Sequence, residues 1–340
     1  MRTSTATLAA LLGLAMTCAA LAQAPPVLPV SGPPDWSGFK AHADKAKALA
    51  GEQWKAAADY FCSPGVRVNS ITDPEIEPTR LFDDVWALGD EGTTVYAVTT
   101  PGGIVLIDAL YPDKYEKTLL PQMAKAGLDP AKVRYVLISH GHADHFGGAT
   151  WFQQDYGARV VLSPADWDLA EKARMPPGHP APKRDIEARD GEAITVGGVA
   201  FTPVFVPGHT PGSLAWIFPV TDGGKAHMAG LFGSTILRND RLTTDNLAQE
   251  LASWEKWARI TKARKVDVEL QNHPLFDGMP QKLKAIRARA AGQGSGQPNP
   301  FVVGQASYQR FAGTVAECLK ADIARKGGKV PAALRRRAAR

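Results

Sequence analysis

The stretch Ser139–Gly148, SHGHADHFGG, places three histidines and one aspartate within six residues. A strand-like run, VRYVLIS (133–139), leads into it, and the pair Gly147–Gly148 opens a helical stretch. Neutral imidazoles and carboxylates are the ligands that zinc and similar divalent ions prefer. On a continuous helix these side chains would point in different directions, but on a loop between a strand and a helix they can converge. The stretch therefore predicts a metal site at the end of a strand.

The rest of such a site must come from other parts of the chain. The candidate ligands of the loop are His140, His142, Asp144 and His145. Because tetrahedral zinc takes about four ligands, one ion would be crowded here, and two ions that share the loop are the better account. His209, in VPGHTPGS, and His273, in QNHPL, each follow a strand-like run. Functional residues collect on such loops, so we expect both histidines to complete the site.

Two other histidines lack this setting. His179 lies in the proline-rich MPPGHPAP, and His227 lies inside a strand-like run. A lone histidine is more often a hydrogen-bonded structural residue than a ligand, so both are interpreted as surface or packing residues.

Strand-like segments occur in two batches, each flanked by helical stretches. The first batch begins at Leu81 with VWALG, TVYAVTT and GIVLID, and the second contains AITVGGVAFTPVFV, SLAWIFP, AHMAG and VDVELQN. The expected helices span about 38–60, 114–126, 247–263, 281–291 and 307–325. This order suggests an α/β (α+β) fold with two sheets packed face to face between helical layers. We expect a linker and helical extension over 25–79, one catalytic domain over 80–325, and a basic flexible tail over 326–340.

The N-terminus has the features of an export signal. Arg2 precedes an uncharged, Ala- and Leu-rich run (8–21), and Ala22-Gln23-Ala24 fits a cleavage site. The run is short for a membrane span. We expect residues 1–24 to be a signal peptide and the mature protein to be periplasmic or secreted, with no membrane association after cleavage.

Cysteine and charge add two expectations. Cys62 and Cys318 remain after signal removal, and in an oxidising compartment they form either a disulfide or two buried free thiols. Much of the net charge of +5 lies in the last fifteen residues, which lack aromatic side chains. That composition is typical of a solvated tail and argues against a nucleic-acid partner.

The motifs HGHADH (140–145), GHTPGS (208–213) and NHP (272–274), in this order, resemble the metallo-β-lactamase superfamily from about Leu81 to Ala291. The stretch 191–218 is similar to subclass B3 metallo-β-lactamases. The resemblance implies an αββα sandwich of two mixed sheets with two zinc ions at one edge. It also implies a role for each candidate: His140, His142 and His209 hold the first ion, Asp144, His145 and His273 hold the second, and Asp108 supports the metal loop.

The stretch HMAGLFGST (227–235) departs from the family pattern. Glyoxalase-II-like enzymes, many lactonases and the phosphodiesterase branch carry a metal-bridging aspartate after a late strand, where Gly230 would stand here. Subclass B3 enzymes usually have a serine nearby that orients the substrate carboxylate. Here Leu231 and Phe232 take that place, and Ser234 follows slightly later. The region around Phe232 and the segment 174–185 are expected to face the substrate.

The leading hypothesis is a zinc-dependent β-lactamase, in which a di-zinc-bound hydroxide attacks the carbonyl of a small-molecule β-lactam. Asp144 would position the hydroxide, and Ser213 would either contact the rim of the site or cap its own turn. The rivals are a related metallohydrolase acting on a lactone, thioester or other ester, a nucleic-acid phosphodiesterase, and a non-catalytic binding protein. The complete ligand set argues against the last. The sequence carries no indication of oligomeric state.

Overall fold

A computed structural model describes residues 32–63, 69–236, 242–293 and 296–330. The expected signal peptide, 1–24, and most of the expected basic tail lie outside the described residues. Of the described helices, none combines the length and the apolar character that crossing a membrane requires.

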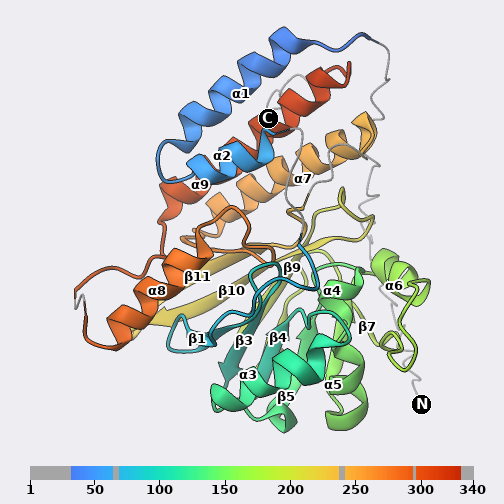
Figure 1. The fold of residues 1–340 in the computed structure, drawn as a ribbon, viewed down its shortest axis with the longest axis vertical. Helices are drawn as coiled ribbons and strands as arrows, with labels where there is room; N and C mark the ends of the chain where they lie inside the picture. Colours follow the sequence, from blue (N-terminus) through green and yellow to red (C-terminus); the bar gives the residue numbers. More distant parts are fainter. Residues whose placement is uncertain (1–31, 64–68, 237–241, 294–295, 331–340) are drawn as a thin grey trace, which may run out of the picture.

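Two sheets form the centre of the molecule (Figure 1). The first has the order β1-β2-β3-β4-β5-β6-β7 and is antiparallel from β1 to β4 and parallel from β4 to β7. Its strands are β1 (Thr79–Arg80), β2 (Val85–Gly89), β3 (Thr94–Thr100), β4 (Gly103–Ile107), β5 (Val133–Leu137), β6 (Arg159–Leu162) and β7 (Ile186–Glu187).

The second sheet has the order β12-β11-β10-β9-β8 and is antiparallel except for the parallel pair β11 and β12. Its strands are β8 (Ile194–Val196), β9 (Val199–Phe205), β10 (Leu214–Asp222), β11 (Lys225–Phe232) and β12 (Val268–Leu270). The expected single strand over 193–206 is in fact the hairpin of β8 and β9. Gly197 and Gly198 both have positive φ at its turn, a conformation that two-residue hairpin turns need and that glycine adopts without steric cost.

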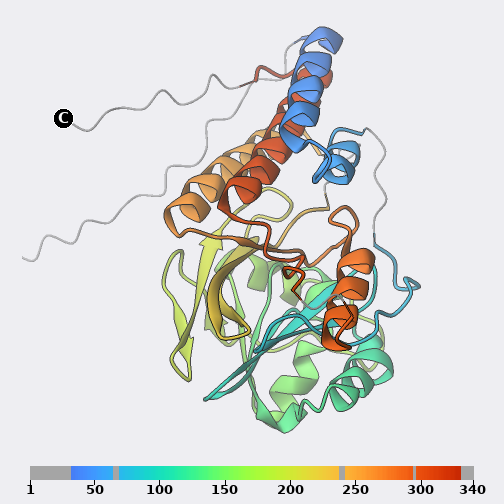
Figure 2. The same cartoon turned by 90° about the vertical axis from the view of Figure 1, so that its left-hand side faces the viewer.

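Helices cover the outer face of each sheet (Figures 1 and 2). Around the first sheet lie a π-helical turn (Tyr115–Leu119), α3 (Leu120–Lys125), a 3₁₀ turn (Pro130–Lys132), α4 (Ala143–Phe146), α5 (Ala149–Tyr156) and α6 (Pro164–Glu171). The second sheet packs against α7 (Thr244–Ala263) and α9 (Gln305–Arg325), and α8 (Met279–Ala290) lies beside β1.

Apolar residues on alternate sides of the strands build this layering. In β3, Tyr96 and Val98 belong to the core between the sheets, whereas Val95 and Ala97 belong to the core under the first helical layer. On the second sheet, Phe232 packs in a third core under α7 and α9, where its ring stacks on Trp254 at a centroid distance of 3.9 Å. The predicted αββα sandwich is confirmed.

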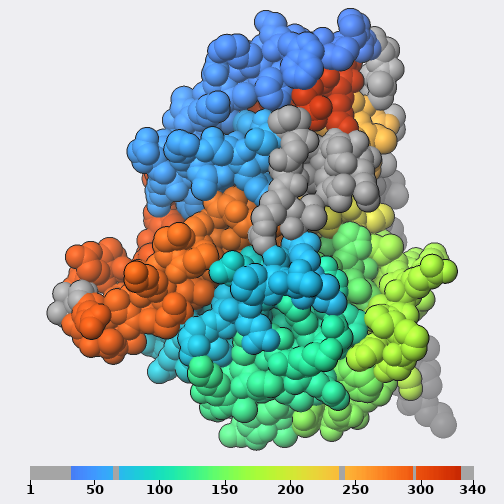
Figure 3. All heavy atoms as spheres, in the orientation of Figure 1, coloured from blue at the N-terminus to red at the C-terminus, as the bar shows by residue number. Residues whose placement is uncertain are grey.

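The N-terminal extension forms two helices, not the single one expected over 38–60. α1 (Trp36–Ala50) ends at Gly51, whose φ of +55° is incompatible with a continuing helix, and α2 (Lys55–Phe61) follows. α1 lies along α9, and in Figure 3 the two blue helices cover most of the red one. A disulfide joins Cys62, after α2, to Cys318 in α9, which decides between the two expected states of these cysteines.

Candidate metal centre

The histidine-rich loop lies at the carboxyl ends of two parallel strands. β4 ends just before Asp108, and its neighbour β5 ends just before the loop. The His142 amide donates to the His140 carbonyl at 3.0 Å, so the chain turns sharply before α4 begins at Ala143. Asp144 and His145 then lie on the single turn of α4. This strand–turn–helix geometry lets all four predicted ligands converge.

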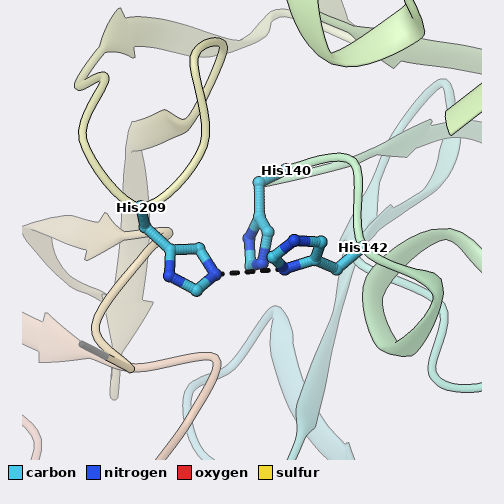
Figure 4. Close-up of side chains that lie close together, drawn as sticks. All are labelled: His140, His142 and His209. Carbon is cyan, nitrogen blue, oxygen red and sulfur yellow. Dashed lines mark hydrogen bonds between the residues drawn. The ribbon is translucent and has the colours of Figure 1, made fainter. Parts of the chain in front are cut away.

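Three of the predicted ligands form one cluster, named here the His209 group: His140, His142 and His209. Their candidate ligand atoms all lie within 4.8 Å of one another. His209 comes from the loop after β9, in the second sheet, and its Nε2 lies 3.1 Å from His142 Nδ1. Figure 4 shows the three rings pointing toward one another. The structure thus brings together three of the predicted ligands from loops of both sheets.

The other three predicted ligands also meet and are named here the His273 group: Asp144, His145 and His273. His145 Nε2 lies 2.9 Å from His273 Nε2, and Asp144 Oδ2 lies 3.2 Å and 3.6 Å from these two nitrogens. His140 borders this group too, because its ligand atoms lie within 4.8 Å of those of His145 and His273. The two groups are thus adjacent and share the first histidine of the loop.

The protonation of the rings favours a cation in both groups. His140 Nδ1 donates to the Gly233 carbonyl at 2.8 Å, which leaves Nε2 as a lone pair that is buried without a hydrogen-bond partner. His273 Nδ1 donates to the Gly92 carbonyl at 2.7 Å, so its Nε2 is also a lone pair. With His145 Nδ1 facing the Asp108 carboxylate, two acceptor nitrogens meet at 2.9 Å. Only a proton or a metal ion between them satisfies such a pair, so these residues fit a bound cation.

Asp108 lies behind the loop, as the resemblance implies. Its carboxylate accepts from the Ser139 amide at 2.7 Å, from the Ser139 hydroxyl at 2.9 Å and faces His145 Nδ1 at 2.7 Å. Asn272, which sequence reasoning missed, adds a fourth contact. Its Nδ2 lies 3.2 Å from Asp108 Oδ2 and donates to Ser139 Oγ at 2.9 Å and to the Gly233 carbonyl at 3.1 Å. Its position beside His273 was the only signal for it in the sequence.

Asn69 is a second residue that sequence reasoning missed. It lies before the expected catalytic domain, yet its Nδ2 donates to Asp144 Oδ2 at 2.7 Å and contacts the Tyr111 hydroxyl at 3.3 Å. The N-terminal segment therefore contributes to the site, although the helices α1 and α2 pack on α9. No motif surrounds Asn69, so the sequence offered no signal for this contact.

Burial keeps most of the imidazoles neutral. It lowers the pKa of His209 to about 3 and the pKa of His273 to about 4, and it also lowers the pKa values of His140 and His142. The pKa of His145 behaves differently: burial lowers it, but Asp144 and Asp108 outweigh burial and raise it to about 10. The pKa of Asp144 is lowered against the effect of burial, by His145 first. Four of the five imidazoles are thus neutral beside an ionised Asp144, the forms that bind metal, whereas a metal ion would have to displace a proton from His145.

Two expectations for the stretch 227–235 are wrong. Gly230 does not face the site, because a Cβ at this position would lie 2.7 Å from the Tyr308 hydroxyl and 3.0 Å from Trp257, under the helical layer. Leu231 and Phe232 are likewise fully buried in the cores, so the region around Phe232 does not face a substrate. The strand β11 continues to Phe232, and the chain first reaches the metal loop at Gly233.

The two candidate serines have different surroundings. Ser213 caps its own turn, since its hydroxyl accepts from the Thr210 amide at 3.2 Å and bonds the Thr210 hydroxyl at 2.7 Å. It is fully buried and does not form a rim. Ser234 directly follows Gly233, and its hydroxyl is buried without a hydrogen-bond partner. Ser234 is as fully buried as Ser213, so neither serine is exposed for the expected contact with a substrate.

The remaining histidines lie apart from both groups. His227 pairs with Asp267 at 2.7 Å near the start of β11, and His179 packs edge-on against Trp151 at a centroid distance of 6.1 Å. Both fit the packing interpretation. His42 of α1 pairs with Glu317 of α9 at 2.8 Å.

Residues 88–222 match the family model of the metallo-β-lactamase superfamily, a range that holds five of the six candidate ligands and leaves out His273. The structure also matches a subclass B3 metallo-β-lactamase of Bradyrhizobium japonicum with a TM-score of 0.57 and 28% identity, over 70% of this chain and 90% of that one. Residues 88–222 therefore form a metallo-β-lactamase superfamily domain, and the fold around it matches that of subclass B3 metallo-β-lactamases. The described residues also include two groups of side chains that could hold a metal ion, one of which lies entirely within this domain.

Other members of the superfamily lie at similar distances. A metallo-β-lactamase of Cronobacter sakazakii matches with a TM-score of 0.56 and 26% identity, over 71% of this chain and 92% of that one. Among curated sequences, a hydroxyacylglutathione hydrolase of Pseudomonas aeruginosa is 31% identical over 150 residues. That match covers 43% of this chain and 46% of the relative, so the chain spans about half the length of the curated relatives it matches.

Proposed function

We propose that this protein is an exported di-zinc β-lactamase. The main support for this proposal is that two groups of candidate ligands, the His209 group and the His273 group, lie next to each other and consist of histidines and one aspartate. The 28% identity to a subclass B3 enzyme over 90% of its chain supports the same substrate class. Ions bound here would supply Lewis-acid polarisation of a carbonyl and would lower the pKa of a bound water towards about 7.

The protein's own residues orient the reacting water. Asp144 stays ionised beside His145, and Asn69 holds its Oδ2 from the other side at 2.7 Å. A fixed anionic oxygen of this kind accepts a hydrogen bond from an attacking water and aligns it. With an ion bound, Asp108 would hold the remaining proton of His145 on Nδ1, which would leave Nε2 to act as a ligand. No serine or cysteine nucleophile is needed.

A thioester hydrolase is the second candidate, because the curated relatives are hydroxyacylglutathione hydrolases. The stretch that follows β11 and passes beside His140 argues against a thioester hydrolase. The resemblance implies a bridging aspartate in such enzymes after a late strand, and here Gly233 and Ser234 occupy the stretch that reaches the site. The β-lactam proposal therefore stands first.

One experiment separates the two candidates. Zinc-loaded protein is mixed with a chromogenic cephalosporin, a carbapenem and a hydroxyacylglutathione thioester, with and without a zinc chelator. We expect β-lactam turnover that stops on chelation, returns with zinc and is lost in His209→Ala. His227→Gln, which removes a histidine outside both groups, should retain it. Turnover of the thioester alone would replace the proposal with the second candidate.

Export is part of this proposal. The composition of residues 1–24 supports it, and the disulfide between Cys62 and Cys318 is typical of an oxidising compartment. Sequencing the N-terminus of protein recovered from outside the cytoplasmic membrane tests it. A mature chain beginning near Pro25 is expected, and an intact N-terminus would contradict it.

A further inference from the structure

Asp166, on the first turn of α6, connects the two loops that carry the His209 group. Its Oδ2 accepts from the Gly141 amide at 2.8 Å and from the Thr210 hydroxyl at 2.6 Å, and its Oδ1 accepts from the Gly212 amide at 2.8 Å. Gly141 lies between His140 and His142, whereas Thr210 directly follows His209. One fully buried carboxylate thus binds both loops at once.

Two glycines allow this close approach. A Cβ on Gly141 would lie 2.7 Å from the Asp166 carbonyl oxygen. A Cβ on Gly212 would lie 2.0 Å from Ser163 Oγ and 2.7 Å from Asp166 Oδ1. Ser163 is the N-cap of α6 and accepts from the Asp166 amide, so this turn is itself held in place. Each loop therefore has a glycine where it packs against the same turn of α6, the yellow-green helix of Figure 1.

The two loops come from different sheets, so their separation is not set by a shared strand pair. At their base, the Leu214 amide donates to the Ser139 carbonyl at 2.7 Å. Nearer the ligands, the three hydrogen bonds to Asp166 make the connection. Glu250 accepts from the His209 amide at 3.0 Å and from Trp254 Nε1 at 3.1 Å, and among the described residues it has no hydrogen bond to the His140 loop. Of these groups, only the Asp166 carboxylate bonds both loops beside the ligands.

The His273 group is held by other residues. Asp108 fixes His145, and the Gly92 carbonyl fixes His273. Asp166 makes none of these contacts. A change at Asp166 should therefore act on one metal position and spare the other.

We infer that Asp166 is a positioning residue that sets the distance between the His140–His142 loop and the His209 loop, and thereby the affinity of the His209 group for its metal ion. This inference rests on the proposed two-zinc centre. It assigns Thr210 a role in the same contact and explains why glycine stands at Gly141 and Gly212.

The test is a stepwise zinc titration against a competing chelator, which measures the affinity of each ion without an activity assay. In Asp166→Asn, an amide N–H₂ must face the N–H or O–H donors of one loop, so that contact is lost. We expect one ion to bind about 10- to 100-fold more weakly, the range typical of residues that support metal ligands, and the other to change by less than about threefold.

Thr210→Val keeps the shape of the side chain but removes the hydrogen bonds of its hydroxyl to Asp166 and to Ser213. It provides a second variant should Asp166→Asn fold poorly. It should weaken the same ion, and Thr210→Ser should restore its affinity. Asp84→Asn is the matched control, because Asp84 accepts from the Thr221 amide at 3.1 Å at the opposite end of β10. It should leave both affinities unchanged.

Two further backgrounds identify the ion. With His273→Ala present, Asp166→Asn should still weaken zinc binding, whereas with His209→Ala present it should have little effect. Wild-type affinities in Asp166→Asn and Thr210→Val, or equal weakening of both ions, would overturn the inference while the two-zinc centre stood. Failure of the wild-type protein to bind two zinc ions would overturn the proposed centre and the inference with it.

Discussion

At the scale of single residues, the second layer of contacts carries as much information as the candidate ligands. Asp108 has a φ of +65°, a left-handed conformation that aspartate and asparagine adopt more readily than most residues. This backbone turns its carboxylate back toward Ser139 and His145 at the end of β4. His145 Nδ1 faces Asp108, and its Nε2 faces His273. A proton held on Nδ1 by Asp108 therefore favours a lone pair on Nε2, the atom that would bind the ion.

Asp108→Asn should therefore weaken the ion of the His273 group. Asparagine tolerates the backbone angle, but its N–H₂ would face either the donors at Ser139 or the Nδ1 proton of His145. The imidazole would then place a proton on Nε2, the ligand atom. We expect about 10- to 100-fold weaker binding of one zinc ion. Chelator competition measures it, with Asp84→Asn as the control.

Asp108→Asn should weaken the ion of the His273 group, whereas Asp166→Asn should weaken the ion of the His209 group. Comparing the two variants therefore tests the assignment directly. If both variants weakened the same ion, the assignment of Asp108 to the His273 group would be wrong. Unchanged affinity for both ions would show that the tautomer of His145 does not depend on Asp108.

The sequence indicated the six candidate ligands, but it wrongly placed Gly230 at the site and the region around Phe232 at the substrate. HGHADH is local, so its spacing alone indicates a metal loop. The error at Gly230 has a physical cause: a strand ends where its last ladder hydrogen bonds end, and β11 pairs as far as Phe232. Asn69 and Asp166 act across tertiary contacts between distant segments, which no local spacing encodes.

At the scale of elements, the docking of α1 on α9 depends on a buried carboxylate. Glu317 of α9 accepts from Lys45 at 2.8 Å and faces His42 Nδ1 at 2.8 Å, and both partners lie on α1. Burial raises its pKa, but Lys45, His42 and Lys320 outweigh burial and lower the pKa of Glu317 to about 2. The ion pairs therefore link the N-terminal extension to the domain by charge as well as by apolar packing.

Glu317→Gln should destabilise the protein in a pH-dependent way. Because the folded pKa lies below the ordinary value of 4.5, the ionised form stabilises the fold above pH 4.5, and that contribution is lost as pH falls toward 2. We expect a loss of roughly 1–2 kcal/mol at pH 7, a value discounted for solvent screening. Urea unfolding at several pH values measures it, and the two proteins should converge only as the pH falls to about 2.

The matched control is Asp44→Asn. Asp44 lies on α1, the helix that carries His42 and Lys45, and pairs with Lys40 in an exposed (i, i+4) pair, a class that contributes little to stability. It should show no measurable change at pH 7. A constant difference between Glu317→Gln and wild type across all pH values would mean that the side chain acts through packing alone.

Helical periodicity predicted most helices well, because an apolar face at 3.6-residue spacing is a local signal. The break at Gly51 was missed because one glycine is tolerated within a helix unless packing requires a turn. The disulfide stayed open in the sequence for a related reason. Whether Cys62 meets Cys318 depends on how α2 packs on α9, across a sequence separation of 256 residues.

At the scale of the whole molecule, the candidate metal centre joins the two halves of the sandwich. The loop after β5 belongs to the first sheet, and the loops after β9 and β12 belong to the second. The sequence predicted the two batches of strands and hence the two sheets. The sequence could not predict which edges of the two sheets come together. That arrangement depends on how residues such as Tyr96 and Trp216 pack in the core between the sheets.

Zinc should consequently stabilise the whole fold. A ligand that binds only the folded state at about 1,000 times its dissociation constant adds about 4 kcal/mol, which raises the melting temperature of a domain of this size by roughly 8–16 °C. Differential scanning calorimetry of metal-free and zinc-loaded protein measures this shift.

The double variant His209→Ala/His273→Ala lacks one ligand from each group and should lose most of the zinc-induced rise in melting temperature, whereas His227→Gln should retain that rise. Magnesium, which prefers oxygen ligands, should not substitute. An equal melting temperature with and without zinc would mean that the two sheets fix their ligand loops without help from a metal, and that the cluster does not bind zinc tightly.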